Sequence, residues 1–490
     1  MIDRRQPVLV GVGQINHRDG DAPDPADMLT EAVRRAAADS GGRLLDAIGS
    51  VRVVSLLSRG YPDPGRLIAE GLRVADAHTV YTTQGGHTPQ LLVDRACDDI
   101  AAGRFDVVAI CGGECWRTRS RIKRRGESSP WVDQARDVVP SELFGEPLRM
   151  ASDDEARLGF TDPVQAYPMF EQALRARHQR SLAEQLRIAS RLWARLSEIA
   201  AGNEYAAIRT PVSAEAIRTP GPDNRLVGFP YPKLMNSNSS VDQAAALLLC
   251  SAETAEGLGV PQDRWVFLHG AGEGNDVPYL SERHDLSTSP AIALAGQTAL
   301  ELAGIGVDDL AHIDLYSCFP SAVEVAAEAL GLSLDRDLSV TGGLTFAGGP
   351  WNAYVLHSLA TMATVLRGEP DAYGLVSANG GFLTKHAVGI WSARPPASGT
   401  RWQSVQKTLD ATVPRRRAAP HHEGEATLET YTVMHDRAGK VERAWVFART
   451  DEGHRTLAVS DDVELLDTLE TEDVIDRTVD VADGVLLDVR

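Results

Sequence analysis

The chain lacks any run of eighteen or so consecutive apolar residues, so we expect no segment that spans a membrane. The apolar stretch after the first charges is only five residues long, which is too short for a secretory signal and typical of a first strand. The five cysteines form an odd and scattered set, which favours a reducing cytoplasm over a disulfide framework. Cys111 and Cys115 lie close together, but no second pair follows, so we expect no zinc site or other metal centre.

Positive charge is also scarce. The chain carries 49 lysines and arginines against 68 aspartates and glutamates, a formal net charge of −19. Because a protein that neutralises many phosphates needs a basic surface, this balance argues against general binding of nucleic acid. A local basic patch for one phosphorylated cofactor is compatible with it. At 490 residues the chain is too long for one hydrophobic core, so we expect two to four domains.

Strand and helix patterns alternate in the first hundred residues and again after residue 289. In the first half we expect strands at 7–13, 47–57, 78–83 and 105–113, with helices at 25–42 and 89–104. In the second half we expect helices at 289–305 and 352–369, with strands at 311–317 and 370–381. This alternation indicates a parallel sheet in each half.

The two halves also share a local pattern. The stretches 103–113 and 368–381 both leave a long helix through a Gly-x-x-Asp turn, run into an apolar strand and end at Gly-Gly. This match predicts an internal duplication. Residues 115–235 lose the alternation and form an insert, with a long helix expected at 172–202, and a helix at 240–259 closes the first half.

The composition changes after Trp391, where a linker with prolines and glycine precedes strands expected at 425–436 and 442–451. We therefore divide the chain into a first half (1–265, with the insert at about 115–235), a second half (266–395) and a β-rich C-terminal module (396–490).

Four stretches, taken in chain order, resemble the motifs of thiolases. They are Gly85–Val108, Met235–Gly259, Asp314–Leu332 and Gly342–His357. They resemble the Cys-x-Ser-Gly helix start, the Asn-Ala-Ser segment, the His-Asp-Cys-Phe segment and the Gly-His-Pro segment of that family. The resemblance covers about residues 1–395, and the appended module further resembles type 1 thiolase-like proteins. It implies an α/β thiolase fold with two duplicated βαβαβαββ halves in five layers (αβαβα), a helical loop insert and the C-terminal β-rich module.

The resemblance also shows where this chain departs from the family. Gly86 stands at the position of the nucleophilic cysteine, so covalent catalysis cannot start there. Tyr316 replaces the Asn or His of the third segment, Gly349 replaces the His of Gly-His-Pro, and Ala378 stands near the second catalytic cysteine. Cys318 matches the cysteine of His-Asp-Cys-Phe, which resembles the acid/base cysteine of sterol-carrier-protein-type thiolases.

Two explanations of these losses stay open. In the first, a rebuilt pocket transfers acyl groups on coenzyme A thioesters, as an atypical acetyl-CoA acetyltransferase-like enzyme of lipid metabolism. Its candidate catalytic residues are Cys318, His87, His386, Tyr316 and Asn379. In the second, the protein binds coenzyme A or acyl-CoA, or serves as a scaffold, without Claisen chemistry. Against both readings, a buried cysteine is most often a core residue, and His87 can be an ordinary helix-start residue.

The ligand implied by the resemblance is coenzyme A or an acyl-CoA, without a tightly bound cofactor. The candidate binding residues are Gly86, Asn236, Asn238, Ser240, Arg124, Arg125 and Gly349. The two arginines belong to a basic run that could meet the phosphates of coenzyme A, although a charge run is usually a solvated face. Ser240 could equally cap a helix. Thiolases commonly dimerise, so the resemblance is compatible with a homodimer, while the extra module leaves a monomer open.

Overall fold

Two β-sheets form the body of the protein, and part of each has the same strand order. The computed structural model describes residues 2–490. The first sheet has the order β1-β8-β4-β2-β3-β5 and the second β10-β11-β12-β9-β13. The strands of the first sheet are β1 (Pro7–Asn16), β2 (Ile48–Val53), β3 (His78–Thr82), β4 (Val107–Cys115), β5 (Glu142–Phe144) and β8 (Asp242–Ser251). Those of the second are β9 (Phe267–Asn275), β10 (Leu310–Asp314), β11 (Tyr373–Gly380), β12 (Lys385–Ser392) and β13 (Arg401–Ser404).

The duplication predicted from the sequence is confirmed by these sheets. The run β2-β4-β8-β1 matches the run β10-β11-β12-β9 in order and in direction. Strands β4 and β11, which end the two matching sequence stretches, occupy the same place. The predicted parallel pairing holds for the neighbours β2 and β4 and for β10 and β11, whereas β8 and β12 run antiparallel to both of their neighbours.

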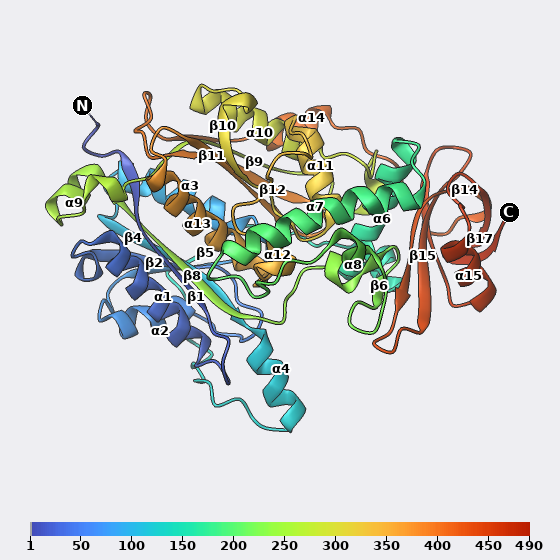
Figure 1. Cartoon of the computed structure of the whole chain (residues 1–490), viewed down its shortest axis with the longest axis horizontal. Helices are drawn as coiled ribbons and strands as arrows, with labels where there is room; N and C mark the ends of the chain where they lie inside the picture. Colours follow the sequence, from blue (N-terminus) through green and yellow to red (C-terminus); the bar gives the residue numbers. More distant parts are fainter. Residues whose placement is uncertain (1) are drawn as a thin grey trace.

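Five layers are stacked through the body (Figure 1). The outer layers contain α1 (Pro25–Ser40) and α2 (Pro64–Leu72) on the first sheet and α10 (Pro290–Ala303) on the second, beside α11 (Pro320–Leu330). Between the sheets lie α3 (Thr88–Ala101) and α13 (Tyr354–Gly368), each of which contacts both sheets. Most residues of both helices are buried, as fits a layer between two sheets, although Arg95 and Asp98 of α3 and Thr364 of α13 are exposed.

Two helices expected from the sequence are not formed as predicted. The stretch 240–259 forms β8 followed by the short α9 (Ala252–Gly257), because a central strand buried on both faces is as continuously apolar as a buried helix. The stretch 172–202 breaks into α6 (Pro163–Arg177) and α7 (Leu182–Gly202). The break is set by Ser181, which caps α7 through a reciprocal capping box with Glu184.

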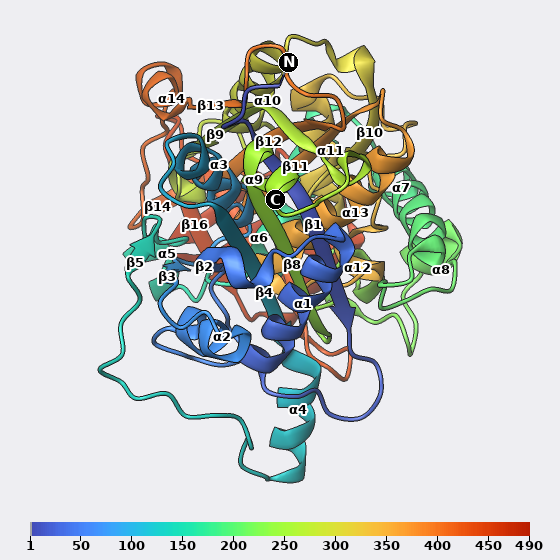
Figure 2. The same cartoon turned by 90° about the vertical axis from the view of Figure 1, so that its left-hand side faces the viewer.

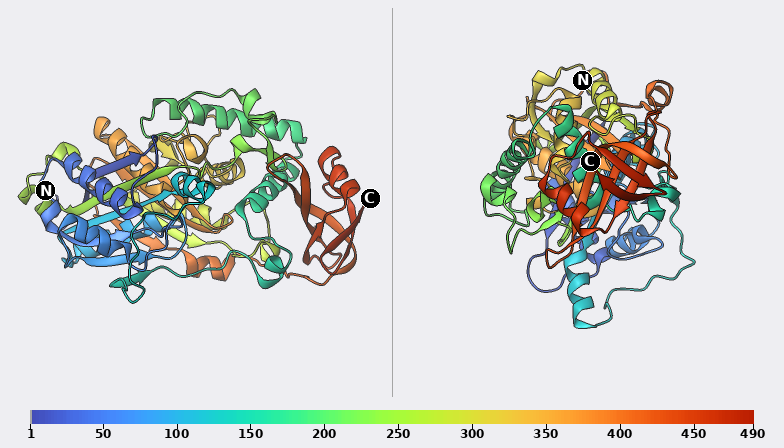
Figure 3. Two further views of the ribbon diagram at one scale, coloured as in Figure 1. Left: turned by 90° about the horizontal axis from the view of Figure 1, so that it is seen from below. Right: turned by 90° about the vertical axis from the view of Figure 1, so that its right-hand side faces the viewer.

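The C-terminal module lies at one end of the elongated molecule, as Figures 1 and 3 show. Its seven-stranded sheet has the order β15-β16-β18-β17-β14-β6-β7, so two strands of the insert complete it. The elements are β6 (Leu226–Gly228), β7 (Tyr231–Pro232), β14 (Glu423–His435), β15 (Val441–Arg449), β16 (Arg455–Ser460), α15 (Val463–Thr471), β17 (Thr478–Ala482) and β18 (Val485–Val489). The first part of the predicted module, residues 401–412, packs on the second sheet instead, since β13 joins β9 and α14 (Gln406–Thr412) packs against it.

The remaining helices belong to the insert and to the loop before α13. They are α4 (Trp116–Arg125), α5 (Asp153–Arg157), α8 (Ala214–Arg218) and α12 (Gly343–Phe346). Helix α4 projects from the body (Figures 1 and 2). Within residues 2–490, no helix is long and apolar enough to cross a membrane, and no group of three or more His, Cys, Asp or Glu side chains could hold a metal ion.

Candidate functional site

Gly86 lies where the start of α3 meets the turn between β11 and β12. A β-carbon placed on Gly86 would stand 2.4 Å from the carbonyl oxygen of Asn379 and 2.5 Å from the phenol oxygen of Tyr316. Real β-carbons do not approach other heavy atoms this closely. The position that the sequence relates to a nucleophile is therefore filled by neighbouring groups, and it admits no side chain without movement of the backbone of Asn379.

Tyr316 is held by contacts at both ends. Its backbone N–H donates to Ser377 Oγ at 2.9 Å, and its hydroxyl donates to the carbonyl oxygen of Trp351 at 3.3 Å. Its ring packs edge-on against Tyr354 with 5.4 Å between the centroids. Burial raises the pKa of the Tyr316 phenol, so the group stays neutral and acts as a hydrogen-bond donor.

Cys318, two residues after Tyr316, is buried and only 6% exposed. The side-chain amide of Asn379 donates to its sulfur at 3.7 Å, and the same amide nitrogen donates to the Tyr167 hydroxyl at 2.9 Å. Burial raises the pKa of the Cys318 thiol to about 12, although hydrogen bonds from Tyr167 and Asn379 lower it in part. The thiol is therefore protonated at neutral pH and is a weak nucleophile.

Three basic side chains surround the first turn of α3. His87 is buried, its Nδ1 has no hydrogen-bond partner within the described residues, and burial followed by the charges of Lys385 and His386 lowers its pKa to about 3. Lys385 Nζ donates to the carbonyl oxygen of Gln84 at 2.9 Å, and burial lowers its pKa. His386 lies opposite Asn379 in the ladder of β11 and β12. Its Nε2 is 3.3 Å from Asp276 Oδ2, an ion-pair distance without hydrogen-bond alignment.

A small cavity of about 10 Å³ lies among Tyr316, Asn379 and His386. Its polar lining comes from Tyr316, Ser377, Asn379 and His386, and its apolar lining includes Ile292 and Ala322. Asn379 Oδ1 and His386 Nδ1 have no partner among residues 2–490. Since a water centre needs about 10–15 Å³, the space holds at most one water, and it is too small for an acyl group in this conformation.

The predicted binding residues Asn236, Asn238 and Ser240 belong to a loop beside Cys318. The Ser237 hydroxyl donates to the Cys318 carbonyl oxygen at 2.9 Å, and the Gly349 N–H donates to the Asn238 carbonyl oxygen at 2.9 Å. Asn236 uses its amide to bond the Pro232 carbonyl oxygen. Ser240 is exposed and precedes a strand, so its alternative interpretation as a helix cap was wrong.

The structure brings Gly86, His87, Tyr316, Cys318, Asn379 and His386 together, and places Asn236, Asn238 and Gly349 in adjoining loops. It does not bring Arg124 and Arg125 into this cluster. They end α4, where Arg125 pairs with Asp21 and Glu127 and Arg124 donates to the Ser120 carbonyl oxygen.

Sequence reasoning missed Tyr167 of α6, whose hydroxyl also accepts the Leu383 N–H at 3.1 Å. A tyrosine in an amphipathic helix gives no signal of such a role, because aromatic residues are ordinary in helix cores. It also missed Asp276 and Trp351, which only the folded chain brings next to His386 and Tyr316. Trp351 has a φ of +47°, which no sequence pattern indicates.

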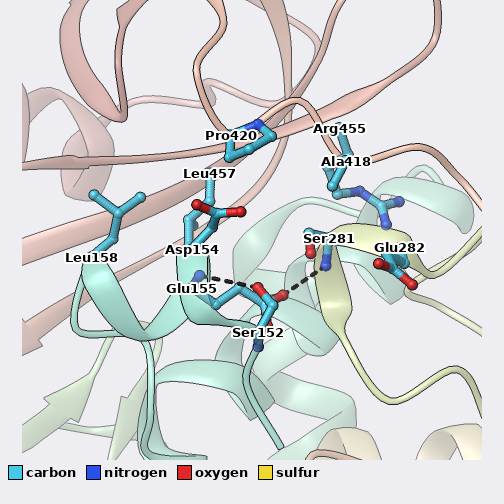
Figure 4. A pocket seen from close by; sticks show the side chains of 10 residues that line it. All are labelled: Ser152, Asp154, Glu155, Leu158, Ser281, Glu282, Ala418, Pro420, Arg455 and Leu457. Atoms are coloured by element: carbon cyan, nitrogen blue, oxygen red, sulfur yellow. Dashed lines mark hydrogen bonds between the residues drawn. The ribbon is translucent and has the colours of Figure 1, made fainter.

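Two larger cavities lie outside this small one. One of about 60 Å³ separates the body from the C-terminal module (Figure 4) and has Glu155 and Arg455 in its wall. Arg455 already bonds the Leu280 carbonyl oxygen and pairs with Glu429, so it serves to attach the module. The other, of about 250 Å³, is an open groove beside α14 whose lining includes Asp276, the residue that pairs with His386.

Comparisons with known proteins agree with this architecture. Residues 404–484 match the thiolase-like protein type 1 additional C-terminal domain. The chain is 34% identical to a monomeric SCP2-thiolase like protein type 1 from Mycobacterium smegmatis, covering 99% of this chain and 98% of that one with a TM-score of 0.84. An acetyl-CoA acetyltransferase from Syntrophomonas wolfei (17% identity, 80% and 100% coverage, TM-score 0.57) and human mitochondrial 3-ketoacyl-CoA thiolase (15%, 80% and 99%, 0.58) share the fold.

Proposed function

Because the chain belongs to the SCP2-thiolase-like protein type 1 family, we propose that it binds coenzyme A or an acyl-CoA without forming a covalent acyl-enzyme. The observation that carries this proposal is the packing at Gly86, where the Tyr316 hydroxyl and the Asn379 carbonyl oxygen fill the space of a nucleophile. A protein that retained thiolase chemistry would need a reactive thiolate at this place.

The class of ligand is supported by the two thiolase-fold enzymes, whose names describe chemistry on coenzyme A thioesters. In this chain the start of α3 still faces the pocket, and a helix N-terminus favours a partial negative charge such as that of a thioester oxygen. His87, Lys385 and Asn379 surround that helix start with buried polar groups. Since the present cavity holds at most one water, the residues that line it must rearrange before an acyl group can enter.

A second candidate function, atypical acyl transfer, is favoured by one observation. The Cys318 sulfur lies within reach of the Asn379 amide and is coupled to the Tyr167 phenol. Both groups could orient the thiol toward a substrate carbonyl. Its pKa of about 12 weighs against this function, because a neutral thiol needs a strong base, whereas His87, with a pKa of about 3, is a weak base and forms no hydrogen bond to the sulfur.

Calorimetry with coenzyme A, acetyl-CoA and acetoacetyl-CoA tests the proposal, together with an assay of acetoacetyl-CoA cleavage. We expect binding at micromolar ligand and no cleavage above background. Absence of any binding contradicts both candidate functions. Cleavage that disappears in Cys318→Ala supports acyl transfer instead, and cleavage unchanged in that variant excludes Cys318 from the reaction.

A further inference from the structure

One histidine of the site lies beside a carboxylate and has a ring nitrogen to spare. His386, at the start of β12, is 1% exposed, and its Nε2 lies 3.3 Å from Asp276 Oδ2. Hydrogen bonds of catalytic groups are often long or poorly aligned until a substrate binds, so this distance is compatible with an Asp–His pair. The other ring nitrogen, Nδ1, is buried and has no partner within residues 2–490. It is therefore available to accept a proton.

Asp276 is fixed by contacts other than the one with His386. Its carboxylate accepts the Ser289 hydroxyl and, at 3.1 Å, the Ala291 N–H in the first turn of α10. Burial favours the neutral acid, but His386 and then Arg283 hold the pKa of the Asp276 carboxyl below its ordinary value. The charged carboxylate can keep the imidazole in one tautomer and stabilise its protonated form. Because Asp276 also lines the open groove beside α14, the pair lies between that groove and the small cavity.

The small cavity beside His386 offers three polar partners to one water molecule. The amide nitrogen of Asn379 already makes two hydrogen bonds, and its Oδ1 has no partner in the described part of the chain. Ser377 Oγ accepts the Tyr316 N–H and can still donate its own hydrogen. These groups line a volume of about 10 Å³, close to what one water centre needs. A water there donates to Asn379 Oδ1 and His386 Nδ1 and accepts from Ser377.

We infer that this water is a nucleophile and that the protein hydrolyses acyl-CoA thioesters. The inference rests on the proposed function, since the thioester must bind first and the cavity lining must rearrange to admit its carbonyl group. The water oxygen bonds to the thioester carbon while His386 Nδ1 takes a proton from the water, and the electron pair of the C=O bond moves to the oxygen at the start of α3. The C–S bond then breaks, and the leaving thiolate takes the proton from the imidazolium.

The products are a free carboxylic acid and coenzyme A, and no bond to the protein forms at any step. A chain with Gly86 at the position of the nucleophile can therefore perform this reaction. It differs from thiolase-type cleavage, which breaks the carbon–carbon bond of acetoacetyl-CoA and needs a second molecule of coenzyme A. The carboxylate of Asp276 acts through His386 and is a positioning residue, whereas His386 contacts the attacking water.

Release of free thiol from acetyl-CoA and hexanoyl-CoA, detected with a thiol reagent, measures hydrolysis by the full-length protein, and calorimetry with coenzyme A measures binding in parallel. We expect the parent to release thiol and His386→Gln to lower kcat about a hundredfold or more, because the general base is lost. Affinity for coenzyme A should stay within about twofold. Asp276→Asn should lower kcat about tenfold or more at an unchanged KM, and it tests the inference independently if His386→Gln does not fold.

Added imidazole distinguishes a base from a structural histidine. It should restore part of the activity of His386→Ala and none to Asp276→Asn, in which the imidazole ring is still present. The matched control is His312→Gln, which removes a histidine–carboxylate pair at the surface, where His312 Nε2 is 3.1 Å from Glu369 Oε2. This variant should hydrolyse both thioesters like the parent.

The outcomes separate the inference from the proposed function. If the parent binds coenzyme A and releases no thiol, the inference is wrong and the proposed function stands. If coenzyme A does not bind, both are wrong. Thiol release that His386→Gln leaves unchanged, or an acyl adduct on Cys318 during turnover, would identify another base or nucleophile and overturn the inference.

Discussion

The phenol oxygen of Tyr316 lies 2.5 Å from the point where a β-carbon on Gly86 would stand, and the Asn379 carbonyl oxygen is 2.4 Å from the same point. Packing at this position thus requires a glycine, and a glycine has no side chain that could act as a nucleophile. A cysteine placed at this position would not fit without movement of the Asn379 backbone.

The first prediction concerns this packing. Gly86→Ala should lower the free energy of unfolding by about 1–3 kcal/mol, because the backbone of Asn379 must move to admit the methyl group. Urea unfolding measures the change. Gly60→Ala is the control, since no atom lies within 4 Å of a β-carbon there and the change should stay within about 0.5 kcal/mol. Equal stability of Gly86→Ala and the parent would contradict the packing at the α3 start.

The second prediction concerns pH. The pKa of His87 is about 3 in the folded protein, below the ordinary value of 6.5, so the unfolded chain binds more protons below pH 6.5. His87 therefore lowers stability progressively as the pH falls from 6.5 to 3. His87→Gln should be more stable relative to the parent at pH 5 than at pH 7, by about 2 kcal/mol. A difference independent of pH would mean that His87 is protonated, or solvated, in the folded state.

The third prediction concerns a buried pair of carboxyl groups behind Cys318. Gln185 donates to Glu171 and Glu324 at 2.7 and 2.8 Å, and burial raises the pKa of both acids, with Glu171 raising that of Glu324 further. Because the folded state holds protons that the unfolded state loses above about pH 4.5, this pair lowers stability as the pH rises. Glu324→Gln should be more stable than the parent at pH 8, and the gain should shrink toward pH 4 in urea unfolding.

The fourth prediction concerns oligomeric state. Strand β5 pairs with the edge of β3 through Val80↔Glu142, Tyr81↔Leu143 and Thr82↔Phe144, which covers that edge of the first sheet. An uncovered edge is a template for pairing with another chain. We expect a monomer by light scattering, and concentration-dependent association of Leu143→Pro, which weakens the β5 pairing. Leu143→Lys is the control, because the Leu143 side chain is 72% exposed. A parent dimer that Leu143→Pro leaves unchanged would contradict this role of β5.

Much of the fold follows from local patterns. The helices before β4 and β11 are amphipathic or apolar over fourteen or fifteen residues, long enough for their period to be unambiguous. Residues 242–251 misled the prediction because burial on both faces removes the alternation that identifies a strand. The match of Cys318 to a family motif, and the departure at Tyr316 two residues earlier, could be seen in the sequence. The contact between Gly86 and the Asn379 carbonyl could not, because the two residues are 293 positions apart and meet only through the packing of the two halves.

The distinction between binding and covalent catalysis is tested most directly by mass spectrometry of the intact protein after incubation with acetyl-CoA and acetoacetyl-CoA, with binding measured in parallel by calorimetry. We expect saturable binding at micromolar ligand and no mass increase, because Gly86 offers no nucleophile and the Cys318 thiol, with a pKa of about 12, is protonated. A stoichiometric acyl adduct that maps to Cys318 and disappears in Cys318→Ala would contradict this expectation and establish acyl transfer.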